Sequence, residues 1–380
     1  NVKADVNLVM RDGTIQQVGR YPNIDAANGG YITYTAATSS SVTGAGLALP
    51  TNWTGAEIAI RINRWDIVRQ KVTAHSGTTV NFTTNPEVPR VNYGCFFQRD
   101  PRTLDKDGEW WYDATNQKLR MYFSGNNPAA FSSLQIATVD TLFLNQYGNI
   151  SVTNIAFNGS GKKAVWNHGG TNVLIKDVDV NNSGAEAITG WFATNVTIDG
   201  CSVENSLGSG IRVWNTSVGP KNLIVKNCTV NKTCLIAGME TTNVMNGGVG
   251  ILCKGGSNVR VFNNTIKNSG YNGIEWQGDT ARVYNNLVEN FCSVRDDGAG
   301  IYTVETGNNS AIPQRYDRKV TSNIVINGIG ARFGTPINTK TNHTARLRQA
   351  KQLLTKPKSE FMQANFYSVK TRLNIVAAGL

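Results

Sequence analysis

A repeat of about 22 residues runs through the middle of the chain and constrains its fold more than any other feature. Similar segments begin at six positions, which are Asn149, Asn172, Asn195, Asn222, Asn258 and Thr280. The segments read NISVTNIAFNG, NVLIKDVDVNN, NVTIDGCSVEN, NLIVKNCTVNK, NVRVFNNTIKN and TARVYNNLVEN, and a degenerate copy, KVTSNIVING, follows at 319–328. Their starts are separated by 23, 23, 27, 36 and 22 residues. Each unit is therefore one structural repeat, and the longer units carry inserted loops.

Within each segment apolar and polar residues alternate, which is the period of a strand with one buried face. A short strand, here called the trailing strand, follows each segment, as in GIRV at 210–213 and GIEW at 273–276. Strands this short bury their apolar face only when successive coils stack about 4.8 Å apart. The sequence therefore predicts an all-β fold, a single-stranded right-handed parallel β-helix.

Two recurring positions mark the turn inside each segment. The first holds an amide or a carboxylate in five copies, namely Asn154, Asp177, Asn227, Asn263 and Asn285, where Asn tolerates a left-handed backbone and stacked amides can hydrogen-bond. The second holds Cys201 and Cys228 in a slot that Ile155 and Val178 fill in earlier coils. We expect these cysteines to be buried apolar residues, and a disulfide is the alternative.

The chain divides into three parts by its regularity. Residues 149–330 hold the regular coils, and 1–148 are predicted to form the first coils with a β insertion that includes a hairpin at 109–123. Residues 331–380 hold nine Lys or Arg against one acid, so this segment supplies most of the net charge of +11. This basic segment is predicted to be either a solenoid cap or a foreign end. No stretch approaches the roughly 20 apolar residues of a membrane helix, so no membrane partner is expected.

The trailing strands predict a binding face. If each central Ile points inward, the residue after it and the third residue after it point outward. The first outward column is Trp166, Thr189, Arg212, Leu252, Glu275 and Tyr302, and the second is His168, Trp191, Trp214, Lys254, Gln277 and Val304. Exposed aromatic rings beside charges and amides suit sugar rings, which stack on aromatics and form hydrogen bonds through their hydroxyls. Some of these rings could instead be covered by other parts of the chain.

Three carboxylates form the candidate catalytic group. Glu275 and Asp297 are 22 residues apart, which is one coil, so we expect them side by side on adjacent rungs. Such a pair can serve as acid and nucleophile, or as acid and base, in glycoside hydrolysis. Asp296 beside Asp297 would favour a protonated acid through like-charge repulsion. The alternative is that Asp296, Asp297 and Gly298 are simply a turn and that Glu275 is solvated.

Two stretches of the chain also resemble a known family. The segment GYNGIEWQGDTARVYNNLVENFCSVRDDGAGIYT at 270–303 is similar to one found in secreted bacterial right-handed parallel β-helix proteins, several of which are glycoside hydrolases, including β-xylosidase-type members. The piece GEWWYD before KLRMYF resembles the hairpin that often precedes their coils. The resemblance covers 5–330 and implies a pectate-lyase-like solenoid. It places Asp297 at the acidic position of the family's Asp-Gly-Gly-Gly-Ile-Tyr-like motif, with Ala299 replacing a Gly.

These observations predict a glycoside hydrolase that acts on a polysaccharide or oligosaccharide without a cofactor or metal, and that is secreted, on the cell surface or periplasmic. One alternative is a polysaccharide lyase that uses Lys254, Arg212 and Tyr302, since abstracting the proton beside a uronate needs a base and a cation. Another is a surface protein that binds sugars without cleaving them. Nucleic-acid binding would depend only on the basic segment 331–380 and is not expected.

Overall fold

The computed structural model describes residues 5–125, 132–240, 247–303, 317–336 and 366–367. Within these residues the chain is all-β, and its helices are three 3-10 turns at η1 (Ala27–Gly30), η2 (Ala45–Leu47) and η3 (Pro101–Thr103). No helix in this part of the chain is long and apolar enough to cross a membrane.

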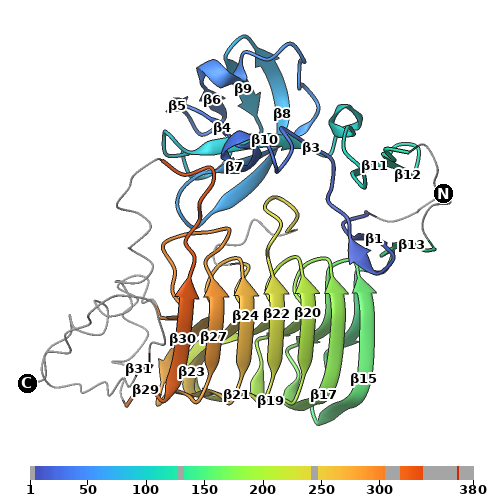
Figure 1. Ribbon diagram of the computed structural model, residues 1–380. Helices are drawn as coiled ribbons and strands as arrows, with labels where there is room; N and C mark the ends of the chain where they lie inside the picture. The colour runs from blue at the N-terminus through green and yellow to red at the C-terminus, as the bar shows by residue number, and fades with distance from the viewer. Residues whose placement is uncertain (1–4, 126–131, 241–246, 304–316, 337–365, 368–380) are drawn as a thin grey trace, which may run out of the picture.

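The predicted solenoid is present, and it forms one continuous parallel ladder from β14 to β31. In Figure 1 one strand of each coil lies in a row, from green β15 to red β30. These strands contain the half of each repeat segment that follows its turn, and they are here called the second strands. A regular coil has three stretches of strand, which are the two halves of the repeat segment and the trailing strand. In some coils two of these stretches are one continuous element, as in β17 and β21. The strands are β14 (Thr141–Asn145), β15 (Ile150–Ser160), β16 (Lys163–His168), β17 (Thr171–Ser183), β18 (Ile188–Trp191), β19 (Thr194–Asp199), β20 (Ser202–Ser206), β21 (Ile211–Lys226), β22 (Thr229–Thr233), β23 (Ile251–Phe262), β24 (Thr265–Ser269), β25 (Ile274–Asp279), β26 (Arg282–Tyr284), β27 (Leu287–Phe291), β28 (Ile301–Tyr302), β29 (Lys319–Thr321), β30 (Asn323–Gly328) and β31 (Phe366–Tyr367).

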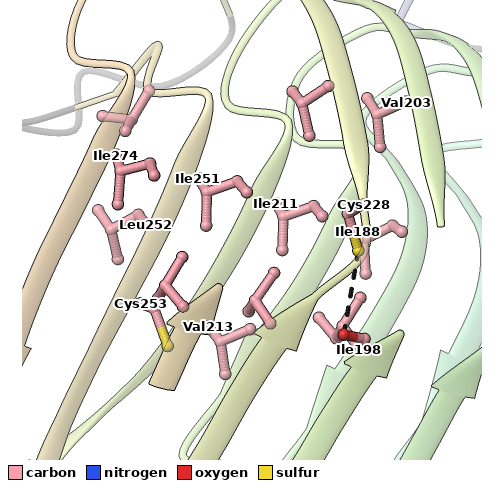
Figure 2. Packing of buried hydrophobic residues seen from close by; sticks show 14 of the residues in the cluster. Ile188, Ile198, Val203, Ile211, Val213, Cys228, Ile251, Leu252, Cys253 and Ile274 are labelled. Atoms are coloured by element: carbon pink, nitrogen blue, oxygen red, sulfur yellow. Dashed lines mark hydrogen bonds between the residues drawn. The ribbon is translucent and has the colours of Figure 1, made fainter. Parts of the chain in front are cut away.

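The central Ile residues of the trailing strands point into the core, as predicted. Ile188, Ile211, Ile251 and Ile274 follow one another in register and are fully buried. Figure 2 shows this column beside a second buried column that includes Val213 and Cys253. Each coil thereby removes its apolar face from water only through the coils above and below it.

The turns carry ladders of Asn side chains. All five predicted turn residues have a positive φ, between 52° at Asp177 and 57° at Asn263. The residues that begin each segment also have a left-handed backbone, and their amides form a ladder in which Asn172 donates to Asn149 at 3.0 Å and Asn195 donates to Asn172 at 2.8 Å. Asn occupies these turns because its side chain tolerates this backbone and pairs with the next coil.

The prediction that the cysteines are buried apolar residues is confirmed, since all six cysteines are buried and free. Beyond Cys228 the same slot holds Asn264, Asn286 and Asn323, which form a ladder inside the core. Asn264 donates to the Asn286 carbonyl at 2.9 Å, and Asn286 donates in the same way to Asn323 at 2.9 Å. Each of these amides also donates to a main-chain carbonyl, so the buried polar groups are satisfied.

The N-terminal part, residues 1–148, contains one strand of the first coil, β14, and the predicted hairpin. The strands described before Thr141 otherwise pair in antiparallel sheets. The eight-stranded sheet contains β3 (Arg20–Tyr21), β4 (Ile32–Thr33), β5 (Ala36–Ala37), β6 (Ser41–Thr43), β7 (Glu57–Arg61), β8 (Ile67–Ser76), β9 (Thr79–Phe82) and β10 (Gly94–Gln98). A three-stranded sheet contains β1 (Val9–Arg11), β2 (Thr14–Ile15) and β13 (Leu134–Ile136), and the predicted hairpin is the pair β11 (Trp110–Asp113) and β12 (Lys118–Met121).

The eight-stranded sheet, here called the N-terminal domain, lies beyond the carboxyl ends of the second strands (Figure 1). Its side chains donate hydrogen bonds to main-chain carbonyls of the loops there, from the Arg61 guanidinium to Val294 at 2.5 Å and from the Gln98 amide to Gly238 at 2.8 Å. Gly334, in the basic segment, donates to the Asn28 side-chain carbonyl and accepts from the Gly94 amide. Residues 337–365 and 368–380 of that segment lie outside the described residues, so whether it is a native cap stays a prediction.

Candidate functional site

The trailing strands form the two columns that the sequence predicts. Parallel register places Trp166, Thr189, Arg212, Leu252, Glu275 and Tyr302 on successive coils. A second row places His168, Trp191, Trp214, Lys254 and Gln277 on successive coils. Val304 lies outside the described residues. We call the surface made by these two rows the trailing-strand face.

The exposure predicted for the first column was wrong. Thr189, Arg212, Leu252 and Glu275 are buried, while Trp166 and Tyr302 are half-buried. Long charged side chains on neighbouring coils cover one another, because Arg212 pairs with Glu186 and Lys254 pairs with Glu275, each at 2.5 Å. The second column is more open, and Trp214 is its most exposed member at 40%.

Aromatic rings gather at the start of this face. The Trp166 ring centroid lies 5.7 Å from that of Trp191 in an edge-to-face contact, and 5.0 Å from that of His168. Phe192 contacts His168 at 6.0 Å and is 67% exposed. These four residues, which we call the aromatic cluster, are an apolar surface of the kind on which sugar rings stack.

An ion network borders the aromatic cluster. Glu186 accepts from Arg212 and lies 3.7 Å from the Lys163 ammonium. The Lys163 nitrogen also stands 4.7 Å from the Trp166 ring centre and 5.1 Å from that of Trp191, within cation–π range. Lys163 is a residue that the sequence analysis missed, because it precedes the strand positions used to define the columns.

Glu275 is fully buried and contacts side chains of its own coil and of the neighbouring coil. Its side chain has no exposed surface, and it pairs with Lys254 at 2.5 Å while Asn272 donates to its other oxygen at 3.0 Å. Tyr302 is its register neighbour on the next coil. The Glu275 carboxylate is therefore ion-paired, hydrogen-bonded and shielded from solvent.

The expected pairing of Glu275 with Asp297 on adjacent rungs was wrong in register. Glu275 lies beside Tyr302, and Asp297 lies in the preceding turn, because that coil carries a longer connection between β27 and β28. Asn272 joins Glu275 to the loop that carries Asp297, since it donates to the Glu275 carboxylate and accepts from the Ala299 main-chain amide at 2.8 Å. The Tyr271 hydroxyl lies beside this loop and donates to the Asp297 main-chain carbonyl at 3.4 Å. Burial raises the pKa of Tyr271, and Tyr302, Glu275 and Asp297 raise it further.

Asp296 is not placed to act on a ligand. It is buried, and its carboxylate accepts from Arg64 of the N-terminal domain at 2.9 Å. Arg64 supplies a compensating charge, so the predicted like-charge repulsion between Asp296 and Asp297 is reduced. Burial lowers the pKa of Arg64, but the hydrogen bond and the negative charges of Asp296 and Asp297 outweigh this effect and raise it. Half-buried Asp297 is thus the more accessible carboxylate of the adjacent pair.

The sequence analysis also missed Arg64, Asn272 and Tyr271. The last two precede Glu275 in the motif GYNGIEW and could have been found there, whereas Arg64 lies 232 residues from its partner. Within the described ranges, no group of three His, Cys, Asp or Glu could hold a metal ion.

Comparisons with known proteins agree with this architecture. A family model described as "Right handed beta helix region" matches residues 121–312. A solved structure described as "Glycoside hydrolase" has a TM-score of 0.67 at 14% identity, with 88% of this chain and 71% of that chain covered. The tailspike protein gp49 from Pseudomonas phage LKA1 has a TM-score of 0.20 at 11% identity, with 78% and 39% covered. No curated protein matches the sequence. The chain belongs to the right-handed β-helix family.

Proposed function

We propose that the protein binds a polysaccharide along the trailing-strand face and hydrolyses glycosidic bonds beside Asp297. The observation that carries this proposal is the aromatic cluster, whose rings lie on the same face as Glu275, a few coils away from it and from the turn that carries Asp297. A group of aromatic rings on the same solenoid as carboxylates suits a long sugar chain that runs along the coils.

The likeness to a glycoside hydrolase structure supports the same reading, although at 14% identity it concerns the fold. Hydrolysis by a pair of carboxylates needs one group that protonates the leaving oxygen and one that attacks or activates water. In this proposal Asp297 reaches the sugar directly. Glu275 takes part when an entering sugar displaces Lys254, because Lys254 otherwise covers it.

A lyase is the second candidate, and one arrangement favours it. Lys254 pairs with Glu275, and Tyr302 lies beside Glu275 on the next coil, so a cation and a phenol stand close to one carboxylate. Proton abstraction beside a uronate uses such a base. The products distinguish the reactions, because a lyase leaves an unsaturated sugar that absorbs in the ultraviolet and a hydrolase does not.

The test is a panel of polysaccharides and aryl glycosides assayed with the wild-type chain, Asp297→Asn and Asp140→Asn. Asp140 forms a surface pair with Lys162 at 2.6 Å and is the matched control. We expect Asp297→Asn to lower kcat by at least about 100-fold, the usual contribution of acid–base catalysis, and Asp140→Asn to leave it unchanged. Full activity of Asp297→Asn would remove the catalytic assignment, and binding without cleavage by wild type would leave a sugar-binding protein.

We further propose that the protein acts outside the cytoplasm, since a polysaccharide too large to enter the cell has to be met there. Fractionation of the native host with an antibody against the chain tests this, and a purely cytoplasmic signal would contradict it.

A further inference from the structure

Polar atoms without partners gather beside the aromatic cluster. Among the residues that the structure describes, no hydrogen bond reaches Thr189 Oγ1, Arg212 Nε or the indole nitrogens of Trp166 and Trp191, although all four atoms are buried. Thr189 stands between Trp166 and Arg212 in register, and Trp191 packs on Trp166. The four atoms therefore belong to one small region of the trailing-strand face.

Such a concentration calls for a physical reason. A buried donor without an acceptor is costly, and native proteins leave few of them. The trailing strands could carry Val at position 189 and Phe at the Trp positions without losing their apolar packing. Polar atoms kept at this cost indicate a group from outside the chain that completes their hydrogen bonds.

The charge and the type of these atoms define that group. Lys163 and Arg212 face the single acid Glu186, so the region carries a net positive charge. Arg212 Nε and both indole nitrogens are donors, and the Thr189 hydroxyl can donate or accept. Glu186 Oε2 is also without a hydrogen bond, but it lies 3.7 Å from the Lys163 ammonium, so donors outnumber acceptors among the unpaired atoms. The missing partner is therefore rich in acceptors and negatively charged.

We infer that this region, made by Lys163, Trp166, Thr189, Trp191 and Arg212, is a subsite for the acidic group of a charged saccharide. The carboxylate of a uronate would pair with Lys163 and, once the side chains that cover Arg212 and Thr189 move aside, accept from these two residues, while its ring stacks on the aromatic cluster. This inference rests on the proposed function, and it specifies an acidic polysaccharide as the ligand.

The experiment compares acidic polymers with their neutral counterparts. Polygalacturonate and alginate are each titrated into the full chain by calorimetry, beside the same polymers after reduction of their carboxyl groups. We expect the acidic forms to bind about tenfold more tightly, as for a charge-assisted hydrogen bond, and this preference to fall as salt is added.

Two variants make the test specific. Lys163→Met should reduce the preference for the acidic polymer several-fold, whereas Lys162→Met, which removes the neighbouring surface lysine paired with Asp140, should not. Thr189→Val should weaken binding while the free protein keeps or gains thermal stability, because an unpaired hydroxyl is removed. A merely structural Thr189 would not give this combination.

The outcomes separate the two proposals. Equal affinity for acidic and reduced polymers, or an undiminished preference in Lys163→Met, overturns the acidic subsite and leaves polysaccharide binding in place. Absence of binding to every acidic and reduced polymer overturns the subsite, and if the neutral polysaccharides of the activity panel also fail to bind, the proposed function falls with it.

Discussion

Arg64 of the N-terminal domain and Asp296 of the solenoid are joined twice. The Arg64 guanidinium donates to the Asp296 carboxylate at 2.9 Å, and the Asp296 amide donates to the Arg64 carbonyl at 2.8 Å. Because Asp297 follows with a left-handed backbone at φ 61°, the loop that carries it is fixed from the N-terminal domain. The N-terminal domain, part of the region predicted to form first coils with a β insertion, thus supports the candidate site.

Arg64→Met should destabilise the protein strongly. It leaves the buried Asp296 carboxylate without its cation, and breaking a buried pair in this way costs about 3 kcal/mol or more. Arg11→Met is the control, since Arg11 pairs with Asp107 at the surface, where a pair is worth about 1 kcal/mol at most. Thermal unfolding measures both, and equal shifts in the two variants would contradict the role given to Arg64.

The buried amide ladder should tolerate no apolar replacement. Asn286→Val removes the acceptor for the Asn264 amide and the donor to the Val261 carbonyl, and each orphaned group costs about 1–3 kcal/mol. Cys228→Val changes the same slot two coils earlier. Val178 fills the equivalent slot in a still earlier coil, so this replacement should cost less than about 1.5 kcal/mol. Chemical denaturation measures the free energy of unfolding of both variants. Similar losses in the two would show that the amide hydrogen bonds of the ladder add no stability of their own.

Buried thiols should make the protein sensitive to alkali. Burial raises the pKa of Cys253 to about 12, so the folded state keeps this thiol protonated when the unfolded chain has lost the proton. The unfolded state then binds fewer protons, and stability falls as pH rises from about 9 towards 12, by roughly 1 kcal/mol at pH 10. In Cys253→Ala the unfolding free energy should be lower overall but decline less steeply with pH. A slope unchanged from wild type would contradict this account.

The solenoid could be predicted from the sequence because its contacts are local and periodic. One alternation and one coil length place Ile188, Ile211, Ile251 and Ile274 in a buried column. The N-terminal sheets could not be predicted in this way. Their pairings join distant segments without a repeat, as where Cys95 meets Ile60 and Phe97 meets Tyr21.

The two columns of the site could be predicted from the sequence, but the burial and the ion pairs of their side chains could not. Register follows from the repeat, so Trp166, Trp191 and Lys254 are found where expected. Burial of Glu275 depends on which cation reaches it, and a sequence does not specify this. The position of Asp297 relative to Glu275 depends on the length of one turn, which departs from the average coil.

The most direct test of the central claim is the affinity for polysaccharide of Trp191→Ala beside Tyr122→Ala. Trp191 lies in the aromatic cluster, whereas Tyr122 is 39% exposed and follows β12 of the N-terminal hairpin. We predict that Trp191→Ala weakens binding by at least about tenfold, as for an aromatic contact at a binding site, and that Tyr122→Ala binds like wild type. Unchanged binding by Trp191→Ala, or equal losses in both variants, would contradict a sugar site on this face.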